Sequence, residues 1–263
     1  MTSHIPGLIH IHSTYSHDGT MSLREIAALS REKGCRFIAL TEHAESMDAR
    51  KMSDLVSESK ALSDADLIVI PGLEYNCEGM HILALGISVL LEGSNQKRLI
   101  DAIHSRGGLA LLAHVVYYDS IPYGKLEDLD GIEIWNPRYA NKFAPSVKSL
   151  KILEKFRKRN RNILAFCGLD LHEKGDLCRL RTTVHAEGSS SDDLIKALRK
   201  GRFHSKGEIM CFDSQKEIGR ITWLTIYSMD VFYRTVEKAV YLLKALGIKP
   251  PEKVSKRIRS MLR

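Results

Sequence analysis

The chain has 263 residues, 44% of them hydrophobic and 27% charged, which suits one large globular domain, alone or with a small appendage. With 18 glycines and 7 prolines, the composition excludes a collagen-like or low-complexity protein. Its 39 lysines and arginines exceed its 32 aspartates and glutamates, which favours an acidic partner. It also contains 11 histidines, and histidine is the commonest metal ligand among side chains.

The sequence shows no segment that would direct it to a membrane or to export. The N-terminus lacks a basic stretch followed by an apolar one, so we expect no signal peptide. The apolar stretch from Ile221 to Tyr233 contains Asp230 and is too short to span a bilayer. Five irregularly spaced cysteines predict reduced thiols. These features predict a cytoplasmic protein without a transmembrane segment.

Short apolar runs alternate with helical patterns along most of the chain. The runs predict strands at Gly7–His12, Arg36–Leu40, Leu67–Ile70, His81–Leu85, Leu109–Ala113, Gly131–Trp135 and Ile163–Cys167. Capping and stop signals predict helices from Ser22 to Gly34, from Ser94 to Gly107, over Pro145–Asn160, and from a cap at Ser191 to Gly201.

Strands that alternate with helices are typical of βα units around a parallel sheet. About seven such units in this length favour a closed or nearly closed (β/α) barrel. A doubly wound sheet is the alternative, but no GxGxxG or GxxxxGK[ST] loop follows any predicted strand.

Ionisable side chains recur where predicted strands end, and one of them, His81, opens a strand. His10 and His12 lie on the same face of the first strand because they are two positions apart. Strand ends of a (β/α) barrel meet at one mouth, so we expect the whole set to converge there. Its nine members are His10, His12, Asp18, His43, Glu74, His81, His114, Asp170 and His172. His17, next to Asp18, is the alternative ligand at that position.

Imidazoles mixed with carboxylates, without thiolates, suit Zn, Mn or Fe. Nine groups exceed the roughly four ligands of one tetrahedral ion. We therefore expect two or three divalent metal ions that share a bridging carboxylate. Such clusters generate hydroxide near neutral pH and stabilise a displacement at phosphorus.

Five motifs, in order, resemble those of the PHP (polymerase and histidinol phosphatase) superfamily of metal-dependent phosphoesterases. They are HIHSTYSHDG, TEH, PGLEYNCEGMHILALG, AH and GLDLH, and the match runs over roughly residues 8–207. The resemblance implies an α/β fold, a distorted seven-stranded (β/α) barrel of TIM type, with a trinuclear metal site. The implied ligands are His10, His12, Glu74 and Asp170 for the first metal, His81, His114 and the bridging Glu74 for the second, and Asp18, His43 and His172 for the third.

The motifs depart from the family pattern without losing a ligand. Glu42 replaces the usual aspartate, and we expect it to orient an imidazole. Leu169 and Leu171 replace smaller residues, which would narrow the mouth, and Val115 replaces a frequent proline. We therefore expect an active site.

The resemblance implies hydrolysis of a phosphate ester by metal-activated hydroxide. Glu74 and Asp170 would take part through the metals, and His17 or a metal-bound water would serve as the general acid. Arg138 is the first candidate to bind the substrate phosphate, and Lys174 and Arg179 are further candidates. We expect Glu133 and Asn136 to support the site from outside.

The substrate class stays open at this point. A phosphomonoester of a small metabolite or nucleotide is our first expectation, and a 3′-end exonuclease activity on nucleic acid is the second. A regulatory module that binds metal without turnover is the third.

The positive charge of the chain is concentrated near its end. Residues 234–263 hold nine cations and two anions, and the rest is formally neutral. We expect a strand or loop over 202–214, a helix over Thr235–Leu246, a break at Pro250-Pro251 and a helix over Glu252–Leu262. Residues 1–211 would form the catalytic barrel and residues 212–263 a basic helical extension. The extension would contact a nucleic-acid backbone, an anionic membrane or another subunit, or lie solvated on the barrel.

A second basic segment, Lys148–Arg161, lies within the predicted barrel. We expect it to be the exposed face of a barrel helix.

Overall fold

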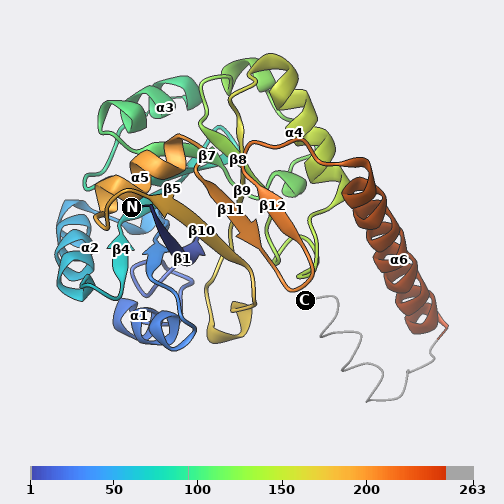
Figure 1. Ribbon diagram of the computed structural model, residues 1–263, viewed down its shortest axis with the longest axis horizontal. Helices are drawn as coiled ribbons and strands as arrows, with labels where there is room; N and C mark the ends of the chain where they lie inside the picture. The colour runs from blue at the N-terminus through green and yellow to red at the C-terminus, as the bar shows by residue number, and fades with distance from the viewer. Residues whose placement is uncertain (1, 94, 247–263) are drawn as a thin grey trace.

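The computed structural model describes residues 2–93 and 95–246, which form an α/β fold (Figure 1). Its strands are β1 Ser3–Ile9, β2 Phe37–Ala39, β3 Glu42–His43, β4 Ile68–Ile70, β5 Gly72–Cys77, β6 Met80–Leu85, β7 Leu109–Leu112, β8 Gly131–Trp135, β9 Leu164–Cys167, β10 Arg181–Ala186, β11 Phe203–Lys206 and β12 Cys211–Asp213. Its α-helices are α1 Leu23–Glu32, α2 Ala49–Leu62, α3 Gln96–Ser105, α4 Val147–Arg159, α5 Ser191–Arg199 and α6 Arg220–Ala245. Its short 3₁₀ turns are η1 Ala44–Ser46, η2 Val115–Tyr117, η3 Tyr123–Lys125 and η4 Lys174–Asp176.

The strands form two mixed six-stranded sheets instead of the expected single seven-stranded barrel. One sheet has the order β12-β11-β10-β1-β2-β4 and the other β3-β5-β6-β7-β8-β9. Two features interrupt a continuous parallel barrel: β10 pairs antiparallel with β1, and β6 lies antiparallel between β5 and β7. Within the described residues, the β1 and β9 ends of the sheets are linked by an isolated bridge between Ile11 and Leu171 and by the backbone hydrogen bonds around it, such as that from Leu169 to Ile9 at 2.9 Å.

The chain nevertheless passes directly from one sheet into the other. Only Pro71 separates β4 from β5, and Leu40 and Thr41 separate β2 from β3. The backbone N–H of Thr41 donates to the carbonyl of Ile11, at 2.9 Å, across the junction. The carboxyl ends of β1, β2 and β4 therefore meet the strands of the second sheet at one place.

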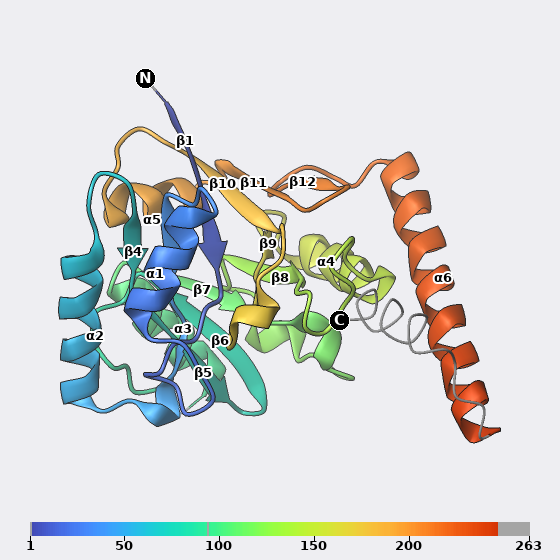
Figure 2. The same ribbon diagram turned by 90° about the horizontal axis from the view of Figure 1, so that it is seen from below.

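Two apolar clusters hold this arrangement together. Alternate residues of both sheets, such as Ile9, Phe37, Leu111 and Phe166, form an inner cluster that Leu198 of α5 completes. The other cluster lies between the sheets and the outer helices α1, α2, α3 and α4 (Figures 1 and 2). Burying this apolar surface is the main driving force for the fold.

All seven predicted strands are present, β8 with the predicted bounds and the other six with shifted ends, and the four predicted barrel helices are present too. The pattern missed β3, β5, β10 and α2, and it gave β11 and β12 only as one strand or loop. The α5 cap is Ser190 rather than Ser191, because the Ser190 hydroxyl accepts a hydrogen bond from the backbone N–H of Asp193.

The helix predicted over Thr235–Leu246 is the second half of α6, which begins at Arg220 and extends to one side of the molecule (Figure 2). It starts earlier because Ile226 is fully buried and anchors its first half. Pro250-Pro251 and the helix predicted over Glu252–Leu262 lie outside the described residues. None of the helices in the described segments combines the length and hydropathy that a bilayer crossing needs.

Candidate metal centre

The structure brings all nine predicted ligands into one cluster where strands of the two sheets end. Three of the nine, His10, His114 and Asp170, have positive φ angles of 68°, 29° and 54°. Such backbone costs about 1–3 kcal/mol per residue and is concentrated at functional sites. Local backbone strain therefore occurs at the residues whose side chains point into the cluster.

The four residues expected at the first metal form a tight group. The Nε2 atom of His10 lies 3.3 Å from Oδ1 of Asp170 and 3.6 Å from Oε2 of Glu74. The Nε2 atom of His12 lies 3.4 Å from each of the same two oxygens. Ligands about 2.0–2.2 Å from a tetrahedral ion are about 3.4 Å apart, so this spacing fits a bound metal.

Two buried nitrogen atoms in this group support that fit. Nε2 of His10 and Nε2 of His12 lack a hydrogen-bond partner, although both side chains are fully buried. An unpaired buried polar atom is costly. The Nδ1 atom of His10 is within 2.8 Å of Glu133, which leaves Nε2 as the free ligand atom.

Glu74 joins the first group to a second one. Its Oε2 atom faces His10 and His12, whereas its Oε1 atom lies 2.9 Å from Nδ1 of His81 and 3.2 Å from Nε2 of His114. A carboxylate with its two oxygens directed to different imidazole pairs has the geometry of a bridging ligand.

The third group is more open. The carboxylate of Asp18 lies 3.3 Å from Nε2 of His43 and 3.0 Å from Nε2 of His172. The Asp18 side chain is 40% exposed, so this group faces solvent. His17 is also close enough to form a ligand group with Asp18 and His43, although its Nδ1 atom lies 3.0 Å from the Ser46 hydroxyl.

Glu133 supports the ligands from behind, as expected. It accepts hydrogen bonds from Nδ1 of His10 at 2.8 Å, from the backbone N–H of His114 at 2.6 Å and from the Asn136 amide at 2.8 Å. The Asn136 amide also lies 3.4 Å from Oδ2 of Asp170. Such outer contacts fix the orientation of metal ligands.

Gly168, which begins the GLDLH motif, leaves room for this contact. A Cβ atom at this position would overlap the carboxylate of Glu133 and lie 2.7 Å from Cβ of His10. Only glycine therefore fits beside the hydrogen bond between Glu133 and His10.

Glu42, which we expected to orient an imidazole, reaches the imidazole of His12 through Ser16. It accepts hydrogen bonds from Ser13 and, at 2.6 Å, from the hydroxyl of Ser16. Ser16 in turn lies 3.4 Å from Nδ1 of His12 and accepts from the backbone N–H of His43. Glu42 acts through a serine because its own carboxylate is fully buried against that loop.

The electrostatics of the cluster are those of a cation site. Burial acts to raise the pKa of Glu74 but the neighbouring His10 holds it well below the ordinary value, and the pKa of Asp170 is lowered against burial in the same way. Burial lowers the pKa of His12 to about 4. Burial also acts to lower the pKa of His10, but Glu133, Asp170 and Glu74 together raise it well above the ordinary value. The carboxylates that favour positive charge on His10 would equally favour a bound cation.

One of the three predicted phosphate-binding cations lies at the cluster. An Nη1 atom of Arg138 is 3.3 Å from Nδ1 of His172 and 3.3 Å from Oδ2 of Asp176. Lys174 is exposed in η4, and Arg179 is 81% exposed beside Glu208. The contacts of the described residues bring neither Lys174 nor Arg179 to the ligands.

Three tyrosines around His114 were not predicted. The ring centres of Tyr139, Tyr117 and Tyr118 lie 4.7, 5.8 and 5.8 Å from the imidazole centre of His114. Tyr118 also accepts a hydrogen bond from the backbone N–H of His81. The only sequence signal was their position just after a predicted ligand or next to Arg138.

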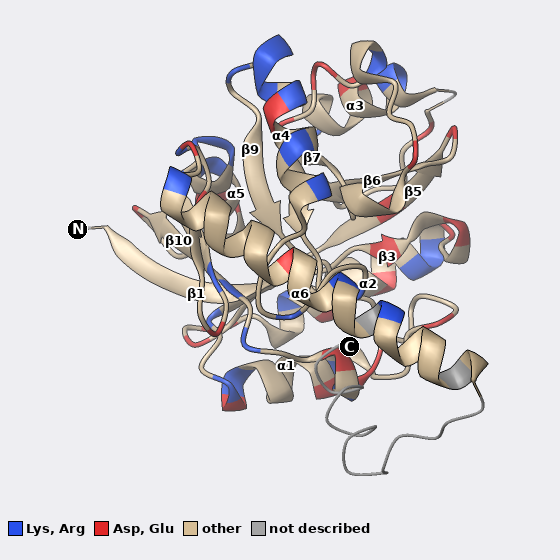
Figure 3. Cartoon of the chain, turned by 90° about the vertical axis from the view of Figure 1, so that its right-hand side faces the viewer, with Lys and Arg blue, Asp and Glu red and all other residues tan. Residues whose placement is uncertain are grey.

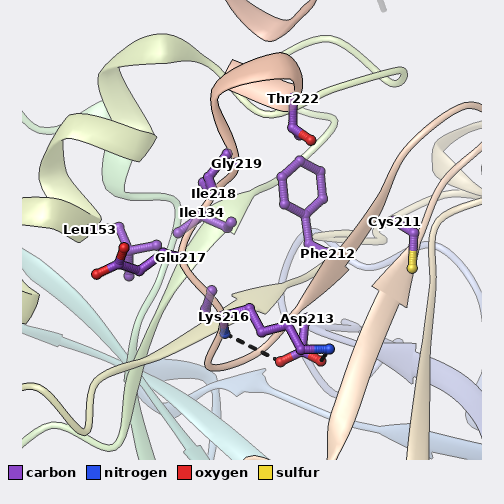
Figure 4. Close-up of a pocket in the computed structure, with 11 residues that line it drawn as sticks. Ile134, Leu153, Cys211, Phe212, Asp213, Lys216, Glu217, Ile218, Gly219 and Thr222 are labelled. Carbon is purple, nitrogen blue, oxygen red and sulfur yellow. Dashed lines mark hydrogen bonds and ion pairs between the residues drawn. The ribbon is translucent and has the colours of Figure 1, made fainter. Parts of the chain in front are cut away.

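A separate small pocket of about 160 Å³ lies between β8, β12, α4 and the start of α6 (Figure 4). Its polar contact is the 3.1 Å ion pair between Lys216 and Asp213. None of the candidate ligands lines this pocket.

Residues 9–130 match the family model of the PHP domain. The match covers the strands and loops that carry seven of the nine candidate ligands, and it confirms the resemblance seen in the motifs. A comparison with curated proteins finds no significant match.

Solved structures with a similar fold include a two-domain protein from Bacteroides vulgatus containing a predicted PHP-like metal-dependent phosphoesterase. It is 20% identical, with a TM-score of 0.60, over 87% of this chain and 70% of that one. The lesion-specific endonuclease PfuEndoQ from Pyrococcus furiosus is 16% identical, with a TM-score of 0.52, over 76% of this chain and 56% of that one. PsfC from Pseudomonas syringae is 13% identical, with a TM-score of 0.50, over 89% and 98% of the two chains.

Proposed function

We propose that this chain, which carries a PHP domain, hydrolyses phosphate esters with the help of two or three bound divalent metal ions, Zn, Mn or Fe. The observation that carries the proposal is the ligand cluster itself, in which buried imidazole nitrogens without partners face two carboxylates at metal-ligand spacing. Bound ions would supply activated water and neutralise charge that develops at phosphorus.

The residues of the chain have separate tasks in this proposal. Glu74 and Asp170 would be the catalytic carboxylates, because both face the Nε2 atoms of His10 and His12 and would hold an ion that activates water. The ligand sets are His10, His12, Glu74 and Asp170; Glu74, His81 and His114; and Asp18, His43 and His172.

Arg138 is the proposed phosphate-binding residue. Its guanidinium lies beside His172 and is held by Asp176, with the side chain 42% exposed. A planar guanidinium can donate two parallel hydrogen bonds to phosphate oxygens. Lys174 and Arg179 could bind a more distant part of the substrate from the surface.

His17 is the proposed general acid for the leaving group, with a water molecule as the alternative. It is exposed and lies next to Asp18 in the sequence. The centre of its ring is 5.1 Å from the ring centre of His43. Its position at the solvent side of the third group suits a proton donor that re-equilibrates with water.

Our first proposed substrate class is a phosphomonoester of a small metabolite or nucleotide. The second candidate is a 3′-end exonuclease activity, which is favoured by the tyrosines around His114 and by Lys148, which donates a hydrogen bond to the carbonyl of Val116. A metal-bound module without turnover is the remaining alternative.

The test is phosphate release from a panel of esters by protein of measured metal content. The panel contains glycerol phosphate, an aryl phosphate, nucleoside monophosphates and end-labelled oligonucleotides. We expect turnover of at least one class, its loss on chelation, and its return with Mn²⁺ or Zn²⁺. A D170N variant is expected to be inactive, with E154Q as the control for an exposed carboxylate. Protein with bound metal that turns over none of these esters would contradict the proposal.

We also propose that residues 1–211 are the catalytic unit, that residues 212–263 form a basic extension, and that the protein is cytoplasmic. Supporting the first point, the predicted ligands all precede residue 173. The strand β12 includes residues on both sides of the proposed boundary. Because it pairs with β11, it connects the extension to the catalytic unit.

A further inference from the structure

Two exposed tyrosines stand side by side at the rim of the ligand cluster. The side chains of Tyr117 and Tyr139 are 61% and 39% exposed, and their ring centres are 5.5 Å apart. Both rings also contact the imidazole of His114. Exposed aromatic rings beside a phosphate-ester site are suited to stacking on a planar group of the substrate.

A basic groove lies directly behind this rim. It has a volume of about 500 Å³, and its lining includes Tyr118 together with Lys148, Lys151 and Lys155 of α4 and Arg234 of α6. The three lysines are at positions i, i+3 and i+7, so they lie on one face of α4. Figure 3 shows lysine and arginine residues along both helices.

The groove carries more positive charge than its own carboxylates neutralise. Its lining contains one acidic residue, Asp119, which lies 3.9 Å from Lys148. Arg234 is paired with Asp230 at 3.0 Å. Within the described residues, Lys151 and Lys155 have no carboxylate within ion-pair distance, and Lys155 lies 5.9 Å from the ring centre of Tyr123.

One short segment, residues 116–118, contacts both the groove and the ligand cluster. Lys148 donates a hydrogen bond to the carbonyl of Val116 at 2.9 Å, which ties α4 to the turn that presents Tyr117. Tyr118 lines the groove and also contacts His114. A chain-like ligand could therefore reach the metals at one end while the rest of it follows the lysines.

We propose that this groove binds the backbone of a single-stranded nucleic acid, with Tyr117 and Tyr139 stacking on a base next to the ligand cluster. The inference rests on the phosphoesterase function proposed above and favours the second of its two substrate classes, nucleic acid. A repeating phosphate backbone matches cations spaced along a helix, and a base matches the exposed rings. A small phosphorylated metabolite needs neither the lysines nor two stacking surfaces.

The test measures binding of a 5′-fluorescein-labelled phosphorothioate oligothymidylate, which resists hydrolysis, to the metal-loaded protein. Fluorescence anisotropy at several salt concentrations gives the affinity and its salt dependence. Each lost cation–phosphate contact lowers the slope of log K against log[salt] by about 0.7 for a single strand. We expect K151Q/K155Q to lower that slope by about 1.4.

The stacking part has its own variants. Y117L and Y139L are each expected to weaken binding at least about fivefold, and Y117F and Y139F to retain it, because stacking needs the ring rather than the hydroxyl. The matched control is K60Q/K196Q, which removes two exposed lysines on α2 and α5 and is expected to bind the strand as the unchanged protein does.

The outcomes separate this inference from the proposed function. Hydrolysis of small esters, with an oligonucleotide affinity and salt slope that K151Q/K155Q leaves unchanged, would overturn the inference alone. Absence of strand binding by the unchanged protein would overturn it as well. Binding with the expected losses, but no hydrolysis of any ester, would keep the groove and overturn the phosphoesterase function.

Discussion

At the scale of single residues, the sequence was enough to predict the ligand set. The residues that hydrogen-bond to the ligands could be predicted only in part. The ligands could be identified in the motifs HxH, TEH and GLDLH because each motif places metal-binding residue types at the end of a predicted strand. Ser16 and Asp176 give no such signal, since their contacts with His12 and Arg138 depend on loop conformation. The pairing of Glu133 with His10 spans 123 positions and follows from neither segment alone.

Glu133 is expected to control metal affinity. In E133Q, the amide cannot accept hydrogen bonds from both His10 and Asn136 as the carboxylate does, so ligand orientation is lost. Removing such an outer contact weakens metal binding by about 10- to 100-fold. Competition with a chromogenic chelator measures the metal affinity. The control is E154Q, which replaces an exposed carboxylate on α4. Equal affinity in E133Q and the unchanged protein would show that Glu133 does not position the ligands.

A second residue-scale prediction concerns pH and lies away from the site. The Nε2 atom of His104 is 2.8 Å from Oδ2 of Asp130, and this hydrogen bond raises the pKa of His104 above its ordinary value of 6.5. A raised histidine pKa stabilises the folded state fully below the unfolded pKa, and this is lost as pH rises through the folded value.

The comparison is between the unchanged protein and H104Q in urea unfolding at about pH 6 and about pH 8.5. We expect the advantage of the unchanged protein to be larger at the lower pH. The same difference in unfolding free energy at both pH values would contradict the assignment.

At the scale of elements, strands were predicted correctly where an apolar run is separated from its neighbours. They were missed where a residue such as proline indicated the end of a strand. Pro71 reads as the end of a strand, but it only marks the passage from β4 into β5. The strand β10 has strict alternation, with Thr182, Val184 and Ala186 buried, and this period could have revealed it. The helix α2 buries few apolar residues, so its pattern is weak.

The cap of α5 provides a test at this scale. Ser190 accepts from the backbone N–H of Asp193 at 3.1 Å and donates to its carboxylate at 2.6 Å, whereas Ser191 is the first helical residue. We expect S190A to lower the free energy of unfolding by about 1 kcal/mol and S191A to change it by less than about 0.5 kcal/mol. Chemical denaturation of both variants measures the free energy of unfolding. A larger loss of this free energy in S191A than in S190A would assign the cap to Ser191.

At the scale of the whole molecule, the barrel expected from the sequence is replaced by two sheets joined where the ligands lie. Counting βα units could not reveal this, because pairing direction depends on contacts such as β1 with β10, far apart in the chain. The backbone hydrogen bonds of the junction include those from Leu169 to Ile9 and from His12 to Leu171, beside the bridge between Ile11 and Leu171. Ligand side chains from both sheets meet there, so bound metal would tie the sheets together.

We therefore expect metal to stabilise the entire fold. Ions that bind the folded protein and not the unfolded chain raise the apparent stability by mass action. Dialysis against a chelator should lower the melting temperature, and Mn²⁺ or Zn²⁺ should restore it. If the melting temperature were the same with and without metal, the ions would not link the two sheets.

We propose that the cluster holds more than one metal ion through Glu74. Elemental analysis of the protein after equilibrium dialysis against Zn²⁺ or Mn²⁺ tests it most directly, with E74Q measured in parallel and E154Q as the control. We expect two or three ions per chain in the unchanged protein and in E154Q, and at least one fewer in E74Q. A chain that binds no metal, or an E74Q variant that binds as many ions as the unchanged protein, would contradict it.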